Sequence, residues 1–149
     1  MKKLSYIILL IVAMMGGFHA QTNAARPEAD GRTIPEAVIG KFKADYPNMQ
    51  PVWSMDGRNY RAEFTDADKG HAVAYDIAGI TIYREEQSPP GSYPAAIDNY
   101  FKSRSPNKKF EVWSSMDKSG MQSYYAKQGA EIFWFDKKGN AKNISKSNP

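Results

Sequence analysis

The chain of 149 residues contains no cysteine and only two histidines. The absence of cysteine excludes disulfides, thiol catalysis, iron–sulfur clusters, cysteine zinc sites and an N-terminal cysteine that carries a lipid. One of the two histidines lies within the first 20 residues, so a site built from several histidines is excluded as well. We therefore expect no cofactor and no metal.

An excess of charge of one sign is also lacking. Lys and Arg number 20 against 16 Asp and Glu, which gives a net charge of +4, and Lys2 and Lys3 supply half of that excess. The other basic residues are scattered among acidic ones, whereas a nucleic-acid binder usually concentrates them on one face. Charged residues make up 24% and aromatic residues 13%. This composition is typical of a globular protein, and we expect no nucleic-acid partner.

After residue 20 no apolar run is long enough to span a membrane, but residues 1–20 have the three parts of a secretory signal peptide. Two lysines precede an apolar run from Leu4 to Met15, and small residues follow it. The run is shorter than the roughly 20 residues of a spanning helix, so an uncleaved anchor is the less favoured alternative. We expect cleavage after Ala20, or near residues 24–25, and a flexible lead-in over 21–32. The mature protein is then periplasmic or secreted.

Two stretches of the mature chain match each other at nearly constant offsets, which predicts a tandem repeat. We expect the first repeat over residues 33–87, a linker over 88–91 and the second repeat over 92–145. One residue inserted before Val112 accounts for the change of offset from 59 to 60. The matches are Thr33-Ile34-Pro35-Glu36-Ala37-Val38 with Ser92-Tyr93-Pro94-Ala95-Ala96-Ile97, Val52-Trp53-Ser54 with Val112-Trp113-Ser114, and Tyr75-Asp76-x-x-Gly79 with Phe135-Asp136-x-x-Gly139.

Each half is predicted to open with a helix and to continue with four strands. Ile34, Val38 and Phe42 recur every four residues and form an apolar stripe, and a capping box begins at Thr33. After each helix the period changes to two, as in residues 60–64. The predicted fold class is α+β: two tandem α-β-β-β-β repeats, with the helices packed on one face of an antiparallel sheet.

The motifs that recur are helix starts, turns and core positions. In the first half they are Ile34-Pro35-Glu36-Ala37-Val38, Phe42, Tyr46-Pro47, Val52-Trp53, Tyr60-Arg61-Ala62-Glu63-Phe64 and Tyr75-Asp76-x-x-Gly79. In the second half they are Tyr93-Pro94-Ala95-Ala96-Ile97, Phe101, Pro106, Val112-Trp113 and Phe135-Asp136-x-x-Gly139. In this pattern the chain resembles the PepSY-like family of exported bacterial proteins, which are also described as periplasmic proteins similar to beta-lactamase inhibitor protein. The resemblance implies two tandem repeats and an open sheet face that grips a partner protein. Inhibition of a peptidase is one role that the resemblance implies. It implies no catalytic motif.

The sequence contains no recognisable catalytic arrangement. His71 is the only histidine after the leader, and no cysteine or Gly-x-Ser-x-Gly elbow accompanies it. Asp66-x-Asp68-x-Gly70 is similar to the start of a calcium loop, but Ile77 stands where such a loop needs glutamate. We interpret these residues as a solvated turn and the protein as a non-enzyme.

The aromatic residues are the strongest functional signal. Alternation along the strands turns Trp113 away from the side of Val112, and it turns Trp134 away from the side of Phe135. Residue types enriched in binding hot spots then gather on the helix-free face. The predicted binding residues are Trp53, Arg61, Tyr83, Trp113 and Trp134. The alternative is that the tryptophans fill the core or the seam between the halves.

These patterns favour an exported, non-enzymatic binding module. Its open sheet face would bind or inhibit a protein or peptide of the cell envelope, such as a hydrolase or peptidase. The main alternative is a periplasmic sensor of a small ligand or glycan that uses the same aromatic side chains. A purely structural role in assembly also stays open, and an enzyme is the least favoured class.

Overall fold

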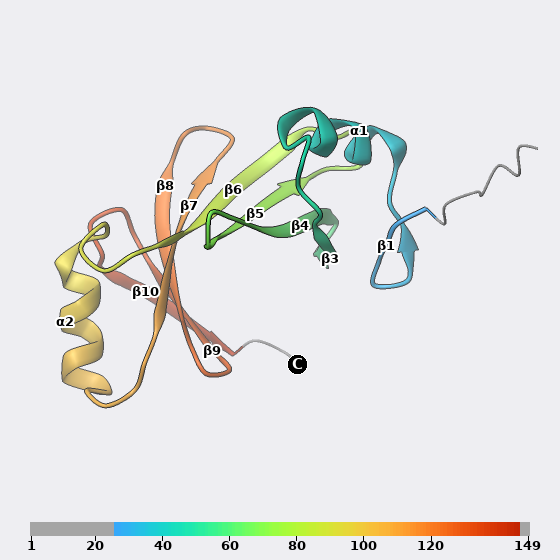
Figure 1. Ribbon diagram of the computed structural model, residues 1–149. Coiled ribbons are helices and arrows are strands. Elements are labelled where there is room, and N and C mark those ends of the chain that lie inside the picture. Colours follow the sequence, from blue (N-terminus) through green and yellow to red (C-terminus); the bar gives the residue numbers. More distant parts are fainter. Residues whose placement is uncertain (1–25, 147–149) are drawn as a thin grey trace, which may run out of the picture.

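The structure is a computed structural model that describes residues 26–146, and the side chains of residues 143–146 are excepted. The predicted signal peptide lies outside the described residues. Within them, two helices and ten strands follow one another along the chain (Figure 1). They are β1 (Glu28–Ala29), β2 (Arg32–Thr33), α1 (Glu36–Asp45), β3 (Val52–Asp56), β4 (Asn59–Asp66), β5 (Lys69–Tyr75), β6 (Thr81–Ser88), α2 (Ala95–Arg104), β7 (Glu111–Asp117), β8 (Gln122–Gln128), β9 (Glu131–Phe135) and β10 (Ala141–Lys146).

Eight of these strands form one antiparallel sheet in the order β10-β9-β8-β7-β6-β5-β4-β3. The pairing of β6 with β7 joins the strands that follow α1 to those that follow α2. Val73 lies in the core under α1 and pairs with Arg84 of β6. Val112 lies in the core under α2 and pairs with Ser88 of β6. Arg84 and Ser88 are four residues apart and so lie on the same side of this strand. The two helices therefore cover the same face, and the predicted α+β fold is confirmed.

Each helix packs on its own apolar cluster. The cluster under α1 includes Val38 and Phe42 of the predicted stripe, and Tyr75 at its centre is fully buried. The cluster under α2 is more aromatic, and the rings of Phe101 and Phe110 stack with centroids 4.1 Å apart. Burial of this apolar surface is the main stabilising term for both helices, because short helices are marginal on their own.

The two Asp-x-x-Gly motifs hold the turns beneath the helix starts. Asp76 Oδ1 accepts hydrogen bonds from the backbone N–H groups of Ala78 and Ile80, and Asp136 makes the equivalent bonds. A Cβ on Gly79 would lie 2.6 Å from the carbonyl oxygen of Ala37, so only glycine lets this turn approach α1. The prediction that these two motifs form turns is confirmed.

The segment before α1 differs from the sequence expectation. Residues 28–32, expected to belong to a flexible lead-in, form the β1–β2 hairpin together with Thr33, and Ala29 is buried in the α1 cluster. Thr33 lies in β2, so it cannot cap the helix, and the predicted capping box is wrong. Pro35 is the N-cap residue and makes no side-chain capping bond. Its fixed φ favours a helix start in the absence of a polar cap.

Candidate functional site

The helix-free face of the sheet has a floor of small side chains. β5 turns Gly70, Ala72 and Ala74 toward this face, because they alternate with core residues. Ala74 lies between Arg61 and Tyr83, its cross-strand partners on the same face. Ala72 and Ala74 are buried although no helix covers them. The small floor leaves room for large side chains of the neighbouring strands to lie across the sheet.

Trp113 of β7 occupies that room. It lies on the helix-free face, as predicted, yet it is only 7% exposed. Its indole reaches β5, where a Cβ on Gly70 would come 2.6 Å from Cη2. The indole stacks on Tyr125 with centroids 6.0 Å apart, and the Nζ of Lys127 lies 4.8 Å from its centre. Trp113 therefore fills the seam between the two halves of the chain.

Trp134 of β9 is the exposed aromatic residue of this face. Its ring centre lies 5.1 Å from that of Tyr125, and the residue is 36% exposed. Trp113, Tyr125 and Trp134 are successive cross-strand partners on β7, β8 and β9. We call these three residues the aromatic row. They give the helix-free face a rigid apolar surface that ends in an accessible indole.

A buried ion pair stands beside the aromatic row. Nη2 of Arg61 donates to Oε2 of Glu85 at 2.7 Å, and the Tyr125 hydroxyl donates to the same oxygen at 3.0 Å. Arg61 also pairs with Glu63. Burial alone would lower the pKa of Arg61, but the hydrogen bond and charge of Glu85 outweigh it and the pKa is raised. Burial, reinforced by the charge of Glu85, raises the pKa of Tyr125, so its hydroxyl stays a donor at neutral pH.

Tyr83 links the edge strand to the centre of the sheet. Its hydroxyl donates to Oδ2 of Asp56 at 2.7 Å, and across the sheet Tyr83 pairs with Asp117 of β7. Burial and the bond to Asp56 raise the pKa of Tyr83. Oδ1 of Asp117 accepts bonds from Ser119 and Met121, and these bonds hold the pKa of this carboxyl below its usual range. Tyr83 is thus flanked by two carboxylates.

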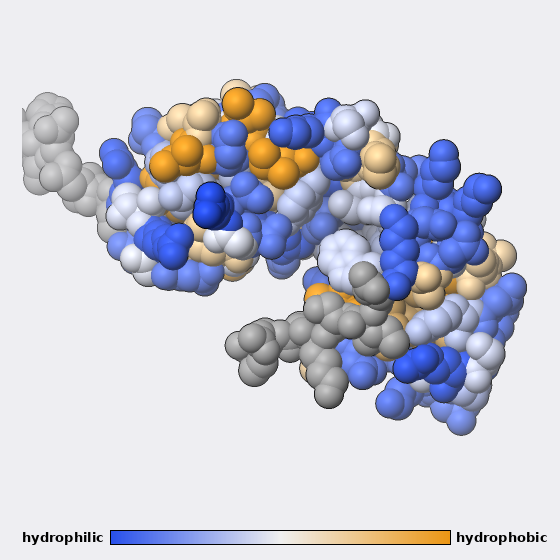
Figure 2. Space-filling view, turned by 180° about the vertical axis from the view of Figure 1, so that it is seen from behind, coloured by the Kyte–Doolittle hydropathy of each residue, from blue (hydrophilic) through white to orange (hydrophobic). Residues whose placement is uncertain are grey.

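A groove with a volume of about 640 Å³ opens between these side chains. Strands β3 and β4 form one wall, β7 to β9 form the other, and β6 lies between them (Figure 1). Figure 2 shows it as the hollow between two lobes of the surface. Its lining residues are Ser54, Met55, Asp56, Arg61, Glu63, Tyr83, Glu85, Ser115, Asp117, Tyr125, Lys127, Ile132 and Trp134. The groove brings together three predicted residues, Arg61, Tyr83 and Trp134, while Trp113 lies buried in the adjacent seam.

The predicted position of Trp53 is wrong. Trp53 pairs with Ala62 and points to the α1 side, where its ring centre lies 5.5 Å from that of Phe42. In the second half, the position that corresponds to Trp53 is Val112, which lies in the cluster under α2. These two positions are 59 residues apart, the same offset that relates the two helices. The offset therefore changes after this strand and not before it, in the hairpins that follow. A shift of one residue moves every side chain of a strand to the other face, so the matching Val-Trp-Ser triplets face opposite sides.

Sequence reasoning missed Glu85, Tyr125 and Lys127. No local pattern predicts these partners, because Glu85 lies 24 residues from Arg61 and Tyr125 lies 40 residues from Glu85. Burial lowers the pKa of Lys127, and the charge of Arg61 adds to this effect. The adjacent tyrosines Tyr124 and Tyr125 offered a signal, since one of any such pair must face away from the core. Tyr124 is the one that lies in the α2 cluster.

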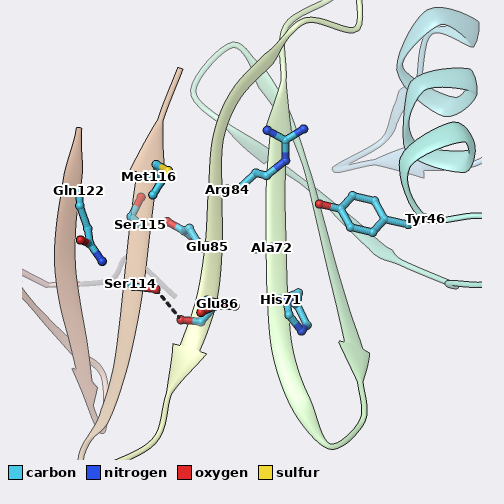
Figure 3. Close-up of a pocket in the computed structure, with 10 residues that line it drawn as sticks. All are labelled: Tyr46, His71, Ala72, Arg84, Glu85, Glu86, Ser114, Ser115, Met116 and Gln122. Atoms are coloured by element: carbon cyan, nitrogen blue, oxygen red, sulfur yellow. Dashed lines mark hydrogen bonds between the residues drawn. The ribbon is translucent and has the colours of Figure 1, made fainter. Parts of the chain in front are cut away.

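A second hollow of about 310 Å³ lies on the other face, between the two helix clusters (Figure 3). Tyr46, at the end of α1, points toward the strands, and Arg84 and Glu86 of β6 stand on the floor (Figure 3). Arg84 pairs with Asp45 at 3.4 Å, and Glu86 pairs with Lys69 at 3.1 Å. These charges are balanced inside the protein, so this hollow selects no ligand by charge.

His71 and the Asp66-x-Asp68-x-Gly70 segment contact residues of the sheet and its hairpin turn. The His71 ring stacks on Phe64 with centroids 5.4 Å apart. Asp66 pairs with Lys69 across the β4–β5 hairpin, whose turn residues Ala67 and Asp68 both have positive φ. Within residues 26–146 no group of acidic and histidine side chains is arranged to hold a metal ion. None of the helices in that range is long and apolar enough to cross a membrane.

Solved structures with the same fold come from several Bacteroides species. They include a Bacteroides eggerthii DSM 20697 protein inferred to be periplasmic, with a TM-score of 0.63 and 18% identity over 80% of this chain and 90% of that one. A DUF2874 family protein from Bacteroides uniformis ATCC 8492 has a TM-score of 0.60 and 17% identity over 75% and 88%. A BLIP-like protein from Bacteroides fragilis NCTC 9343 has a TM-score of 0.53 and 18% identity over 80% and 92%.

At such low identities the likeness establishes the fold. The BLIP-like structure agrees with the expected similarity to periplasmic proteins related to beta-lactamase inhibitor protein. No protein-family model matches the chain. No curated protein matches it either. The PepSY-like assignment, the tandem duplication and its boundaries stay predictions.

Proposed function

We propose that the protein is an exported, non-enzymatic binding module that holds a protein or peptide of the cell envelope in the groove of its helix-free face. The observation that carries this proposal is the aromatic row beside the Arg61–Glu85 pair. An accessible indole at the end of a fixed aromatic surface is typical of a binding hot spot. Trp134, Tyr83 and Arg61 are the contacts we assign to the partner.

Rigidity supports this role. Tyr83 and Tyr125 are each fixed at the hydroxyl by a carboxylate, and Trp113 is clamped between Gly70 and Tyr125. Side chains that are ordered before binding lose little conformational entropy on association. The groove therefore has the properties of a preformed recognition surface.

Export supports the choice of partner. The leader pattern of residues 1–20 predicts export from the cytoplasm, and the Bacteroides eggerthii protein of the same fold is inferred to be periplasmic. The BLIP-like neighbour makes inhibition of an envelope hydrolase or peptidase the specific form of binding that we favour.

The test is an affinity capture from envelope extract, followed by a dissociation constant for the purified partner. The bait is used beside Trp134→Ala and beside Ile77→Ala, which removes an exposed apolar side chain outside the groove. We expect the wild type and Ile77→Ala to capture the same protein and Trp134→Ala to lose it. Equal capture by all three baits would reject the groove as the binding surface.

A small ligand or glycan is the second candidate, favoured by the volume of the groove. Its 640 Å³ falls within the usual range of small-molecule sites, and stacked aromatic rings line one wall. Titration with envelope saccharides should then change the tryptophan fluorescence of the wild type and leave that of Trp134→Ala unchanged. A flat response across the panel would leave the protein or peptide partner as the remaining occupant.

A further inference from the structure

We infer that the groove receives a partner segment carrying a lysine or arginine side chain, whose cationic group docks on Tyr83 between Asp56 and Asp117. This inference rests on the proposed function and names the chemistry of the partner. It follows from the net negative charge of the groove lining and from the position of the carboxylates that carry this charge.

The groove is acidic although the protein as a whole is basic. Its lining holds four carboxylates, from Asp56, Glu63, Glu85 and Asp117, against two cations, from Arg61 and Lys127. The whole chain has a net charge of +4. The local excess of negative charge is therefore a property of this surface and not of the composition. Opposite charge across an interface speeds association and selects the partner.

Both cations of the groove are already engaged. Arg61 is bonded to Glu85 and paired with Glu63. Lys127 lies over the indole of Trp113, on the side of the groove away from Tyr83. The negative charge that remains is that of Asp56 and Asp117.

Neither of these two carboxylates forms a salt bridge with a basic side chain among residues 26–146. Asp56 accepts from the Tyr83 hydroxyl, and Asp117 accepts from the N–H groups of its own turn. The charge of Lys118, next in the chain, helps to lower the pKa of Asp117, but Lys118 makes no salt bridge with it within the described residues and does not line the groove. Both carboxylates are exposed and remain free to accept a charged donor from outside.

The position of the two carboxylates suits a single cation. Asp117 is the cross-strand neighbour of Tyr83 at its backbone end, and Asp56 is bonded to its hydroxyl at the other end. A cation on the face of this ring lies between two negative charges and gains a cation–π contact as well. Tyr125 and Trp134, on the opposite wall, provide apolar surface for the rest of the segment.

A display library of random twelve-residue peptides, selected on the immobilised full chain, tests this inference. We expect selected peptides to be enriched in lysine and arginine over the starting library. Replacement of the basic residue by norleucine should weaken binding at least tenfold, and the Asp56→Asn/Asp117→Asn variant should do the same. The matched control is Asp76→Asn/Asp136→Asn, which alters two turn aspartates outside the groove. It should bind like the wild type.

The outcomes separate this inference from the proposed function. Peptides that depend on Trp134 but show no excess of basic residues, or that bind Asp56→Asn/Asp117→Asn as well as wild type, would overturn the cationic partner alone. A selection that yields no Trp134-dependent peptide of any charge would overturn both. Thermal melting of each variant verifies that it is folded, and binding should weaken several-fold as salt rises to about 0.5 M, because salt screens exposed charges.

Discussion

Gly70 of β5 lies directly beneath the indole of Trp113 of β7, so close that a Cβ on the glycine would be 2.6 Å from Cη2. The backbone of Gly70 is not in the left-handed region, since it is absent from the positive-φ glycines of the described chain. The close approach of the indole therefore requires glycine here. A single missing side chain lets a residue of the second half pack on a strand of the first.

Gly70→Ala should displace this indole and destabilise the protein by about 1–3 kcal/mol, as overpacking does. The stack on Tyr125 and the contact with Lys127 leave the ring little freedom to move aside. Urea denaturation measures the loss, and near-ultraviolet circular dichroism reports the displaced tryptophan.

Gly40→Ala is the matched control for this change. Gly40 lies on the exposed side of α1, with no atom within 4 Å of an added Cβ. Alanine there should stabilise the protein by about 0.5–1 kcal/mol through its higher helix propensity. Shifts of the same sign for the two variants would contradict the packing of Trp113 on Gly70.

Arg61→Met should cost about 3–5 kcal/mol, because it leaves the buried carboxylate of Glu85 without its cation. Arg84→Met is the control, since Arg84 is exposed and its pair with Asp45 is 3.4 Å long. We expect that change to cost under about 1 kcal/mol. Thermal denaturation at neutral pH compares the two.

Adding Glu85→Gln to Arg61→Met should restore part of the lost stability. The amide removes the unpaired charge and still accepts the Tyr125 hydroxyl. A double variant that is less stable than Arg61→Met would show that the charge of Glu85 is not the source of the cost.

The sequence predicted features that depend on nearby residues better than features that depend on the pairing of distant strands. The Asp76 and Asp136 turns were predicted correctly, because their hydrogen bonds close within four residues. The inward positions of Tyr75 and Phe135 were also correct, since each is anchored by such a turn. The predicted face of Trp53 was wrong. Alternation shows which residues of a strand share a face, but it does not show which face is buried, and one misplaced insertion exchanges the two faces. The Arg61–Glu85–Tyr125 network depends on strand pairing that no local pattern specifies.

Trp53 and Trp134 should have opposite roles in stability and binding. Trp53→Ala removes a ring packed on Phe42 and should lower the free energy of unfolding by about 2–3 kcal/mol without weakening a groove-bound partner. Trp134→Ala should cost less than about 1.5 kcal/mol, since the residue is partly exposed, yet it should weaken that partner at least tenfold. Denaturation and a binding titration on the same samples measure both. Loss of binding in Trp53→Ala at full folding would contradict the assigned faces.

Asp117 and Asp136 should make the stability of the protein depend on acid. The bond from the Ser119 side chain lowers the pKa of Asp117, and that from the Asn140 side chain lowers the pKa of Asp136. A carboxyl with a lowered pKa in the folded state stabilises it fully above the unfolded pKa of about 3.9, and this contribution is lost as the pH falls through the folded value. Asp117→Asn/Asp136→Asn should therefore melt below the wild type at pH 6, and the gap should close toward pH 2. A gap that is the same at both pH values would assign the effect to the turn hydrogen bonds instead of to the charge.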